Sequence, residues 1–96
     1  MALILTRRAG ESVKIGDNVV MTVRKVNPKK IYVVFEASNI QNGCWIPLYA
    51  SYLLSDVGLN LEVTGISGSQ VRLAFDADKS IKIVRMHSIR GEKRSY

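Results

Sequence analysis

Two pairs of segments in this chain alternate apolar and polar residues with a period of two, and this pattern constrains the fold most. Residues 19–24 and 31–36 flank a turn that contains Pro28, and residues 59–63 and 71–75 flank a second turn rich in Ser and Gly. A period of two places alternate side chains on opposite faces of a strand, so each pair predicts a β-hairpin with one buried face. We therefore predict an all-β domain with mostly antiparallel strands and little helix.

The inward positions of these hairpins, and of a further alternating segment at 81–85, predict the core. Burial of one apolar face is what holds an antiparallel sheet to the rest of its domain. The expected core residues are Val23, Ile31, Val33, Phe35, Val63, Val71, Leu73, Phe75 and Ile83.

The second hairpin repeats the first with a shift of forty residues and without a gap. Val23 aligns with Val63, and residues 35–37 (Phe-Glu-Ala) align with residues 75–77 (Phe-Asp-Ala). Any two hairpins share alternation, so generic β patterning explains part of the match. The repeated Phe-acid-Ala sequence favours an internal duplication.

The composition places the chain among small, basic, folded domains. Its 96 residues suffice for one domain with a modest core, and 47% of them are hydrophobic. Lys and Arg number 14 against 8 acidic residues, which gives a net charge of +6 and a pI near 9.8. This balance favours nucleic acid or an anionic surface as the partner.

The single cysteine, Cys44, excludes an intrachain disulfide and favours a reducing, cytoplasmic location. One His and one Cys do not make a structural zinc site, and nothing in the sequence brings His87 near Cys44. The longest apolar run, 45–54, is interrupted by Pro47 and Ser51 and is too short to cross a bilayer. We therefore expect no catalysis, no metal, no cofactor and no membrane partner.

The amino-terminal segment 3–8, Leu-Ile-Leu-Thr-Arg-Arg, alternates as a strand and ends in two adjacent arginines. Arg7 lies on one face of this strand and Arg8 on the other. A guanidinium group suits planar or phosphate-bearing acceptors, which it binds in a bidentate manner. Solvated charges, or ion pairs with Glu11 and Asp76, are the structural alternative.

Residues 38–58 differ from both hairpins because they are nearly neutral and rich in turn formers. Residues 44–48 predict a short strand that Pro47 confines to an edge, and residues 49–54 predict a helical turn or two closed by Gly58. The tail 86–96 is expected to be a frayed end with a short or no C-terminal helix. The chain is thus expected to be a single domain made of a first hairpin unit at 1–37, a connector at 38–58, and a second hairpin unit with the tail at 59–96.

Four motifs of this chain resemble the carbon storage regulator (CsrA) family, whose members are small post-transcriptional regulators. The motifs are LILTRRAGE at 3–11, IGD at 15–17, ISGSQVRLAFDA at 66–77 and IKIVR at 81–85. The resemblance covers residues 1–37 and 59–85 without a gap, but the hairpin portion occurs twice. The chain therefore looks like a divergent member with a duplicated hairpin or a large insertion.

The resemblance implies an intertwined, mostly antiparallel sandwich in which the first strand of one protomer lies beside the last strand of the other. It also implies an RNA-binding domain that recognises GGA-containing loops of messenger RNA or small RNA to control translation or stability. Carried over by position, the RNA-binding residues are Ile4, Leu5, Thr6, Arg7, Arg8, Ala77, Asp78, Lys79, Val84 and Arg85.

Three departures from the family pattern bear on this site. Asp78 stands where the family usually has proline, and its charge can repel phosphate. The family's His-Arg-Glu after the last strand is Val-Arg-Met at 84–86, so only the arginine is kept. If residues 38–58 are the worn remnant of a first-copy last strand, Leu48 falls where Arg85 falls in the second copy.

A protein-interaction role is the alternative to RNA binding. A degenerate paralogue can pair with an ordinary family member through exposed strands and antagonise it. Asp78 and the apolar connector favour that role, whereas retention of Arg7, Arg8 and Arg85 favours direct RNA binding.

Two models of assembly follow from the repeat. If the two hairpins pair as two protomers do, the chain is a monomeric pseudo-dimer with one RNA site. In the competing model the chain forms a symmetric homodimer with residues 18–58 as an insertion, and the particle has two sites. We favour the monomeric pseudo-dimer.

Overall fold

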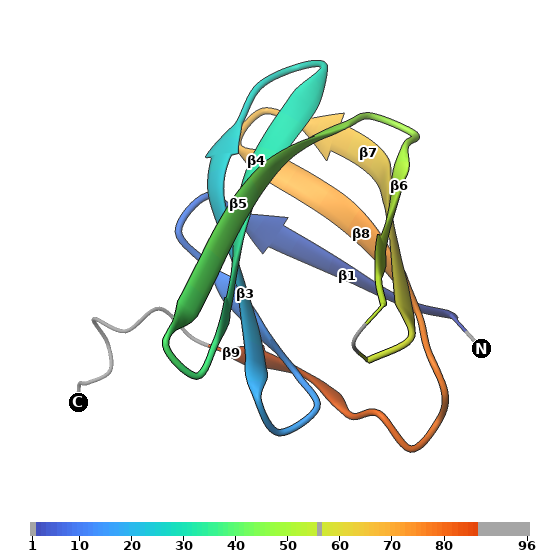
Figure 1. The fold of residues 1–96 in the computed structure, drawn as a ribbon. Helices are drawn as coiled ribbons and strands as arrows, with labels where there is room; N and C mark the ends of the chain where they lie inside the picture. Colours follow the sequence, from blue (N-terminus) through green and yellow to red (C-terminus); the bar gives the residue numbers. More distant parts are fainter. Residues whose placement is uncertain (1, 56, 87–96) are drawn as a thin grey trace, which may run out of the picture.

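The computed structural model describes residues 2–55 and 57–86, which form nine β-strands (Figure 1). The predicted all-β class is confirmed, and every strand pair in the two sheets is antiparallel. The strands are β1 (Ala2–Arg8), β2 (Ser12–Ile15), β3 (Val19–Val26), β4 (Lys30–Ala37), β5 (Ile40–Pro47), β6 (Ser51–Leu54), β7 (Leu59–Ser67), β8 (Gln70–Asp76) and β9 (Ile83–Met86).

The strands form two sheets that enclose one core. The four-stranded sheet has the order β1-β8-β7-β6, and the five-stranded sheet has the order β5-β4-β3-β2-β9. The first strand therefore pairs with the second hairpin, and β9 pairs with the first hairpin, so each sheet combines distant parts of the chain (Figure 1). This exchange ties the two halves into one body.

The core follows from the alternation of the strands. Eight of the nine predicted core residues are buried, and Ile83 is half-buried because it lies on the edge strand β9. Further buried residues complete the cluster, among them Val13, Ile15, Met21, Ile46, Leu59 and Leu61.

The two halves of the chain repeat one hydrogen-bond scheme. The pairs β3–β4 and β7–β8 have the same register after a shift of forty residues, and each register breaks at the same place, after Val23 and after Val63. A shared β-bulge is a specific feature that generic alternation does not produce. Because the predicted duplication extends to this irregularity, β3 and β4 are structurally equivalent to β7 and β8.

The equivalence continues into residues 38–58. The Gly10 amide donates to the Val23 carbonyl at 2.6 Å, and the Tyr49 amide donates to the equivalent Val63 carbonyl at 2.7 Å. Both donors have a positive φ, 94° for Gly10 and 69° for Tyr49. The turn after β5 therefore copies the turn after β1, so β5 is the counterpart of β1 and β6 is the counterpart of β2.

This result corrects two predictions for the connector. Residues 49–54 were expected to be helical, but residues 51–54 form β6, which pairs with β7 as β2 pairs with β3. Residues 40–47 are not the remnant of a last strand, because β5 occupies the place of a first strand. The expected edge strand at 44–48 is confirmed within the longer β5.

The sheets differ in one element. In the five-stranded sheet β9 covers the outer edge of β2, whereas the equivalent edge of β6 carries no further strand among the described residues.

The predicted strand at 81–85 is β9, shifted to 83–86 because the Ile81 amide closes a turn on the Asp78 carbonyl. Met86, the first residue of the expected frayed tail, instead ends β9, and the rest of that tail lies outside the described residues. In the part of the chain that is described, no helix is suited to crossing a membrane.

Candidate functional site

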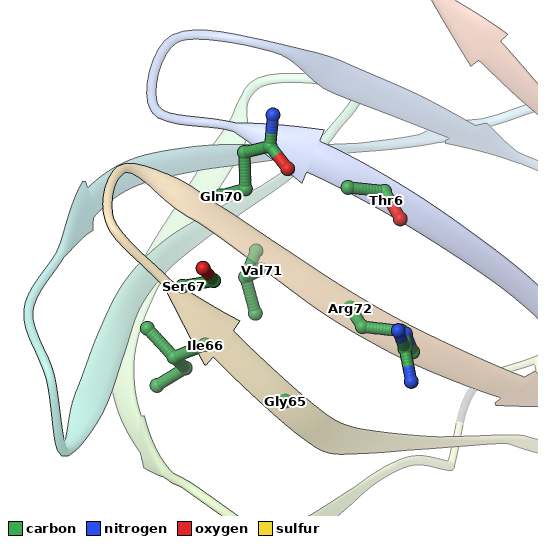
Figure 2. A pocket seen from close by; sticks show the side chains of 7 residues that line it. All are labelled: Thr6, Gly65, Ile66, Ser67, Gln70, Val71 and Arg72. Carbon is green, nitrogen blue, oxygen red and sulfur yellow. The ribbon is translucent and has the colours of Figure 1, made fainter.

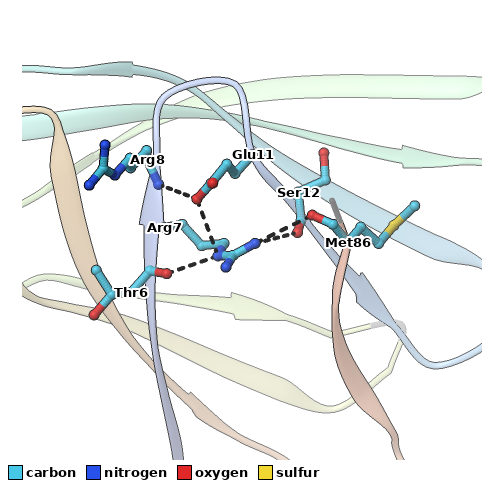
Figure 3. Close-up of polar contacts among 6 residues, drawn as sticks. All are labelled: Thr6, Arg7, Arg8, Glu11, Ser12 and Met86. Atoms are coloured by element: carbon cyan, nitrogen blue, oxygen red, sulfur yellow. Dashed lines mark hydrogen bonds and ion pairs between the residues drawn. The ribbon is translucent and has the colours of Figure 1, made fainter. Parts of the chain in front are cut away.

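The predicted site lies where the edge strands of the two sheets meet. β1 is the edge of the four-stranded sheet and β9 is the edge of the five-stranded sheet. Arg7 of β1 reaches the main chain of Met86 (Figure 3). Leu3 of β1 lines the same hollow as Ile83 of β9. Because residue 3 lies near residue 83 and residue 7 near residue 86, the two strands run in the same direction.

Arg7 links these edges through its guanidinium group. Its Nη1 donates to the main-chain carbonyls of Met86 at 3.3 Å and Ser12 at 3.4 Å, while Nε donates to the Thr6 carbonyl at 2.9 Å (Figure 3). Nε also lies 3.6 Å from Oε1 of Glu11. With only 12% of its side chain exposed, Arg7 holds β1, the start of β2 and the end of β9 together.

Arg8 faces the opposite side of β1 and is exposed. Its main-chain amide donates to Oε1 of Glu11 at 2.8 Å, so one carboxylate serves both arginines (Figure 3). In the amide orientation that satisfies both groups, the Gln70 side-chain oxygen accepts from the Arg8 guanidinium at 2.9 and 3.2 Å. Glu11 therefore secures the turn after β1. The ion pair of an arginine with Glu11, which the sequence offered as the alternative to RNA contact, is present for Arg7.

The remaining β1 residues divide between the core and the surface. Leu5 is buried against Leu73, so its side chain is directed into the core and only its main chain is available to a ligand. Ile4 is 57% exposed, and Thr6 is exposed on the same face. Because β1 pairs with β8 alone among the described strands, one side of its main chain offers hydrogen-bonding groups outward.

On β9, Val84 is 51% exposed and Arg85 is exposed. Arg85 lies opposite Val13 in the antiparallel register, and paired residues project to the same face of a sheet. Since Val13 is directed into the core, the Arg85 side chain leaves β9 on the side that faces the β1 edge. The structure thus brings the cation of the last strand to the junction with the first.

The loop between β8 and β9 supplies the third part of the site. Ala77, Asp78 and Lys79 line a hollow of about 250 Å³ together with Leu3, Phe75, Ile81 and Ile83. Asp78 Oδ1 accepts from the Ser80 amide at 3.0 Å, and hydrogen bonds from the Ser80 backbone and side chain lower the pKa of the Asp78 carboxyl. The carboxylate therefore stabilises its own turn, which is a role that proline fills by a fixed φ.

The ten predicted residues lie on three elements that meet at this junction, namely β1, the β8–β9 loop and β9. The side chains of Ile4, Thr6 and Arg8 lie on the opposite face of β1 from Arg7. Glu11, Ser12, Gln70 and Met86 also shape the junction, and sequence reasoning did not assign them a place in the site. Glu11 carried a signal, because it stands four residues after Arg7. The main-chain acceptors at Ser12 and Met86 carried none, since any residue type offers the same carbonyl.

Among residues 2–55 and 57–86, no equivalent junction forms at β5 and β6. Leu5 pairs with Leu73 and Cys44 pairs with Val33, so Cys44 is the counterpart of Leu5. By the same register Ile46 stands in the place of Arg7, and its side chain is buried. A first-strand counterpart without the arginine thus faces a position where the described residues supply no last strand.

The groups at the junction are suited to binding a ligand through hydrogen bonds, apolar contacts and positive charge. It combines exposed edge-strand main chain, exposed apolar side chains and the cations of Arg8, Lys79 and Arg85. Among residues 2–55 and 57–86, no group of three or more His, Cys, Asp or Glu side chains is arranged to hold a metal ion.

Residues 2–40 match the model of a family described as CsrA, the global regulator protein family. No curated protein and no solved structure gives a significant match to the chain.

Proposed function

We propose that this chain, whose residues 2–40 match the CsrA family model, is an RNA-binding post-transcriptional regulator of the carbon storage regulator family that binds GGA-containing loops of messenger RNA or small RNA. The observation that supports this proposal is the junction of β1 with β9, where Arg7 contacts the Met86 main chain and where Leu3 and Ile83 line one hollow with the β8–β9 loop. Binding there would control translation or the stability of the RNA, in the cytoplasm.

The residues have distinct proposed roles. Main-chain groups along β1 and β9 read the edges of unstacked bases, and the acceptors of guanine match main-chain and arginine donors. Ile4, Thr6 and Val84 pack against the splayed bases. Arg8, Lys79 and Arg85 contact phosphates or guanine, whereas Arg7 and Leu5 position the strand.

Single-site binding by a monomer is part of the proposal. The pairing of β1 with β8 and of β9 with β2 occurs within one chain, which supports a pseudo-dimer that needs no second copy. The buried Ile46, and the edge of β6 on which no described strand lies, disfavour an equivalent site at β5 and β6. All of residues 1–96 then act as one RNA-binding domain.

A gel shift with a GGA-loop hairpin and a matched CCA-loop hairpin tests the proposal. Arg85→Ala should weaken binding by about 1–3 kcal/mol, because it removes a charge-assisted contact to base or phosphate. Lys29→Ala, an exposed charge in the β3–β4 turn, is the matched control and should bind nearly as wild type does. Equal affinity for the GGA and CCA hairpins would contradict the proposal.

Stoichiometry separates the two assembly models. A monomer that binds one hairpin is expected, as measured by light scattering of the free protein and of the complex. Affinity should also fall steeply with added salt, because several phosphates are neutralised. A stable two-chain particle that binds two hairpins would end the pseudo-dimer model.

The edge of β6 carries no further strand from residues 2–55 and 57–86, and this supports a second candidate function, pairing with an ordinary family member. A last strand donated by a partner would lie on β6 as β9 lies on β2. The two candidates predict different behaviour on mixing. Formation of a mixed particle that has lost RNA affinity would favour the antagonist, whereas independent binding of RNA by this chain alone favours the regulator.

A further inference from the structure

The outer face of the five-stranded sheet carries a row of side chains that the proposed site does not use. Lys25, Tyr32 and Trp45 lie opposite one another on β3, β4 and β5. The rings of Tyr32 and Trp45 are 5.1 Å apart at an interplanar angle of 55°, and Nζ of Lys30 lies 4.6 Å from the Trp45 ring centroid. A cation therefore flanks the aromatic pair at each end.

The row leaves its aromatic surface accessible. Trp45 is 45% exposed, and it lines a surface hollow with Lys25 and Tyr32. Gly43 allows the Tyr32 ring to lie flat across β5, because a Cβ at residue 43 would collide with the Tyr32 hydroxyl and ring. The glycine thus holds open the space in which the tyrosine extends the surface of the tryptophan.

The equivalent row in the other half shows that the fold does not require these rings. By the shared register, Gly65, Arg72 and Thr6 stand in the places of Lys25, Tyr32 and Trp45. Figure 2 shows these three small or polar residues around a hollow on the outer face of the four-stranded sheet. Because the same backbone is built there without aromatic residues, the Tyr32–Trp45 pair is an addition to the fold.

The charge around the aromatic row is positive. Arg24 and Lys25 line the neighbouring hollow with Tyr32, and Lys30 covers the other end of the row. On the same hairpin, Glu36 lies at the far end of β4, where its carboxylate accepts from the Gln41 amide at 3.0 Å. An anionic ligand with flat rings complements this face, and unpaired nucleotides have both properties.

We propose that the row formed by Lys25, Tyr32 and Trp45 is a stacking platform for single-stranded nucleotides that flank the RNA loop bound at the β1–β9 junction. Bases stack on Trp and Tyr while lysines neutralise the adjacent phosphates. The platform rests on the proposed function, since it extends the path of the same RNA. β5 lies four strands from β9, about 19 Å across the sheet, so a flanking strand spans the gap.

Trp45 is the only tryptophan of the chain and reports directly on stacking. Its fluorescence is followed during titration with three RNAs: a bare GGA hairpin, the same hairpin with a single-stranded tail of about ten nucleotides, and the tail alone. Quenching is expected with the tailed hairpin and with high concentrations of the tail, but not with the bare hairpin. The tail should increase affinity roughly tenfold for wild type.

Substitutions separate stacking from folding. Trp45→Leu should abolish the tenfold gain while binding of the bare hairpin is retained, and Trp45→Phe should preserve part of the gain because it keeps a ring. Tyr49→Leu removes an aromatic side chain that is also exposed but lies in the β5–β6 turn, outside the row, and should leave the gain unchanged.

The outcomes distinguish this inference from the proposed function. If the bare hairpin binds but the tail adds no affinity and leaves Trp45 unquenched, the platform is wrong and the junction stands. If the bare hairpin fails to bind while the tail alone quenches Trp45, the platform stands and the junction is wrong. A change in Trp45 fluorescence with protein concentration, and not with RNA, would overturn the platform in favour of self-association.

Discussion

The two halves of this molecule share a backbone scheme and differ in what they present at the surface. In the four-stranded sheet, Arg7 joins β1 to β9, and the outer row is Thr6, Arg72 and Gly65. In the five-stranded sheet, Ile46 is buried in the place of Arg7, and the aromatic residues Tyr32 and Trp45 stand in the outer row. The registers, the bulges and the turn after the first strand are nevertheless the same.

This comparison teaches that the main chain and the inner side chains specify the architecture, whereas the edges and outer rows are free to diverge. Val23, Val33 and Phe35 keep apolar counterparts at Val63, Leu73 and Phe75, all of them buried. The positions that changed character are those where loss of one arginine or gain of one ring leaves the core intact. We therefore expect the β1–β9 junction and the outer row of the five-stranded sheet to differ in function, although both lie on the same repeated backbone.

The largest expected effect tests whether the halves are one cooperative unit. Phe75→Ala and its counterpart Phe35→Ala should each lower the free energy of unfolding by about 3–5 kcal/mol, because each empties a large volume in a shared core. Phe35 also stacks on Tyr52 at 5.4 Å. Denaturant unfolding followed by circular dichroism and by Trp45 fluorescence should give one coincident transition in each variant. Two separate transitions would show that the halves unfold independently.

The second prediction reverses a divergent position. Ile46→Arg gives β5 the arginine that β1 has at the equivalent position, Arg7, but the described residues offer no last strand for it to contact. The free energy of unfolding should fall by about 3 kcal/mol, because a charge is placed in an apolar site without a partner. Ile46→Val, which keeps the site apolar, should cost about 1 kcal/mol. RNA stoichiometry should remain one hairpin per chain.

The third prediction makes the opposite exchange. Arg7→Met removes the contacts to Ser12 and Met86 while keeping an unbranched side chain of similar length. We expect the free energy of unfolding to fall by about 1–2 kcal/mol, because hydrogen bonds from a charged group are replaced by an apolar contact. Amide hydrogen exchange should accelerate in β9 and remain unchanged in β4 and β5. Uniform acceleration throughout the protein would mean that Arg7 acts on global stability and not on the junction.

The smallest effect concerns the counterpart of Leu5. Burial raises the pKa of the Cys44 thiol, and a hydrogen bond with Tyr52 lowers it to a smaller extent. Because the thiolate is the reactive form, alkylation of Cys44 by iodoacetamide at pH 7 should be slower than in an unfolded chain. The rate of alkylation should rise only when the pH exceeds the ordinary pKa of a cysteine thiol. A chain with Cys44→Ser and Leu5→Cys places the thiol at a buried position and should react more slowly still. Alkylation as fast as in the unfolded chain would contradict the assigned environment.

The sequence predicts those parts of the fold that the alternation of apolar and polar residues encodes. The hairpins at 19–36 and 59–75 and eight of the nine expected core residues followed from period-two patterning. The site residues followed from the family motif, and their convergence depends on the β1–β8 and β2–β9 pairings, which no local pattern encodes. Periodicity describes which face a residue occupies, but it does not name the partner strand.

The connector was misread for physical reasons. In β5 the counterparts of Arg7 and Arg8 are Ile46 and Pro47, so the diagnostic residues of a first strand are absent. The shift between equivalent residues is thirty-nine before the β6–β7 turn and forty after it, which breaks the gapless alignment. β6 has only four residues, too few to distinguish alternation from a helical turn.

The pairing of β1 with β8 also determines the order in which the molecule can form. During synthesis the apolar first strand precedes its partner by some seventy residues, since Leu3 pairs with Phe75 and Arg7 with Val71. The first hairpin can close early through local contacts, but β1 has to wait until β8 has left the ribosome, and long loop closure slows such pairing. We infer that β1 stays unpaired and exposes its apolar side chains in the nascent chain until β8 emerges, which makes the nascent chain a substrate for ribosome-associated chaperones.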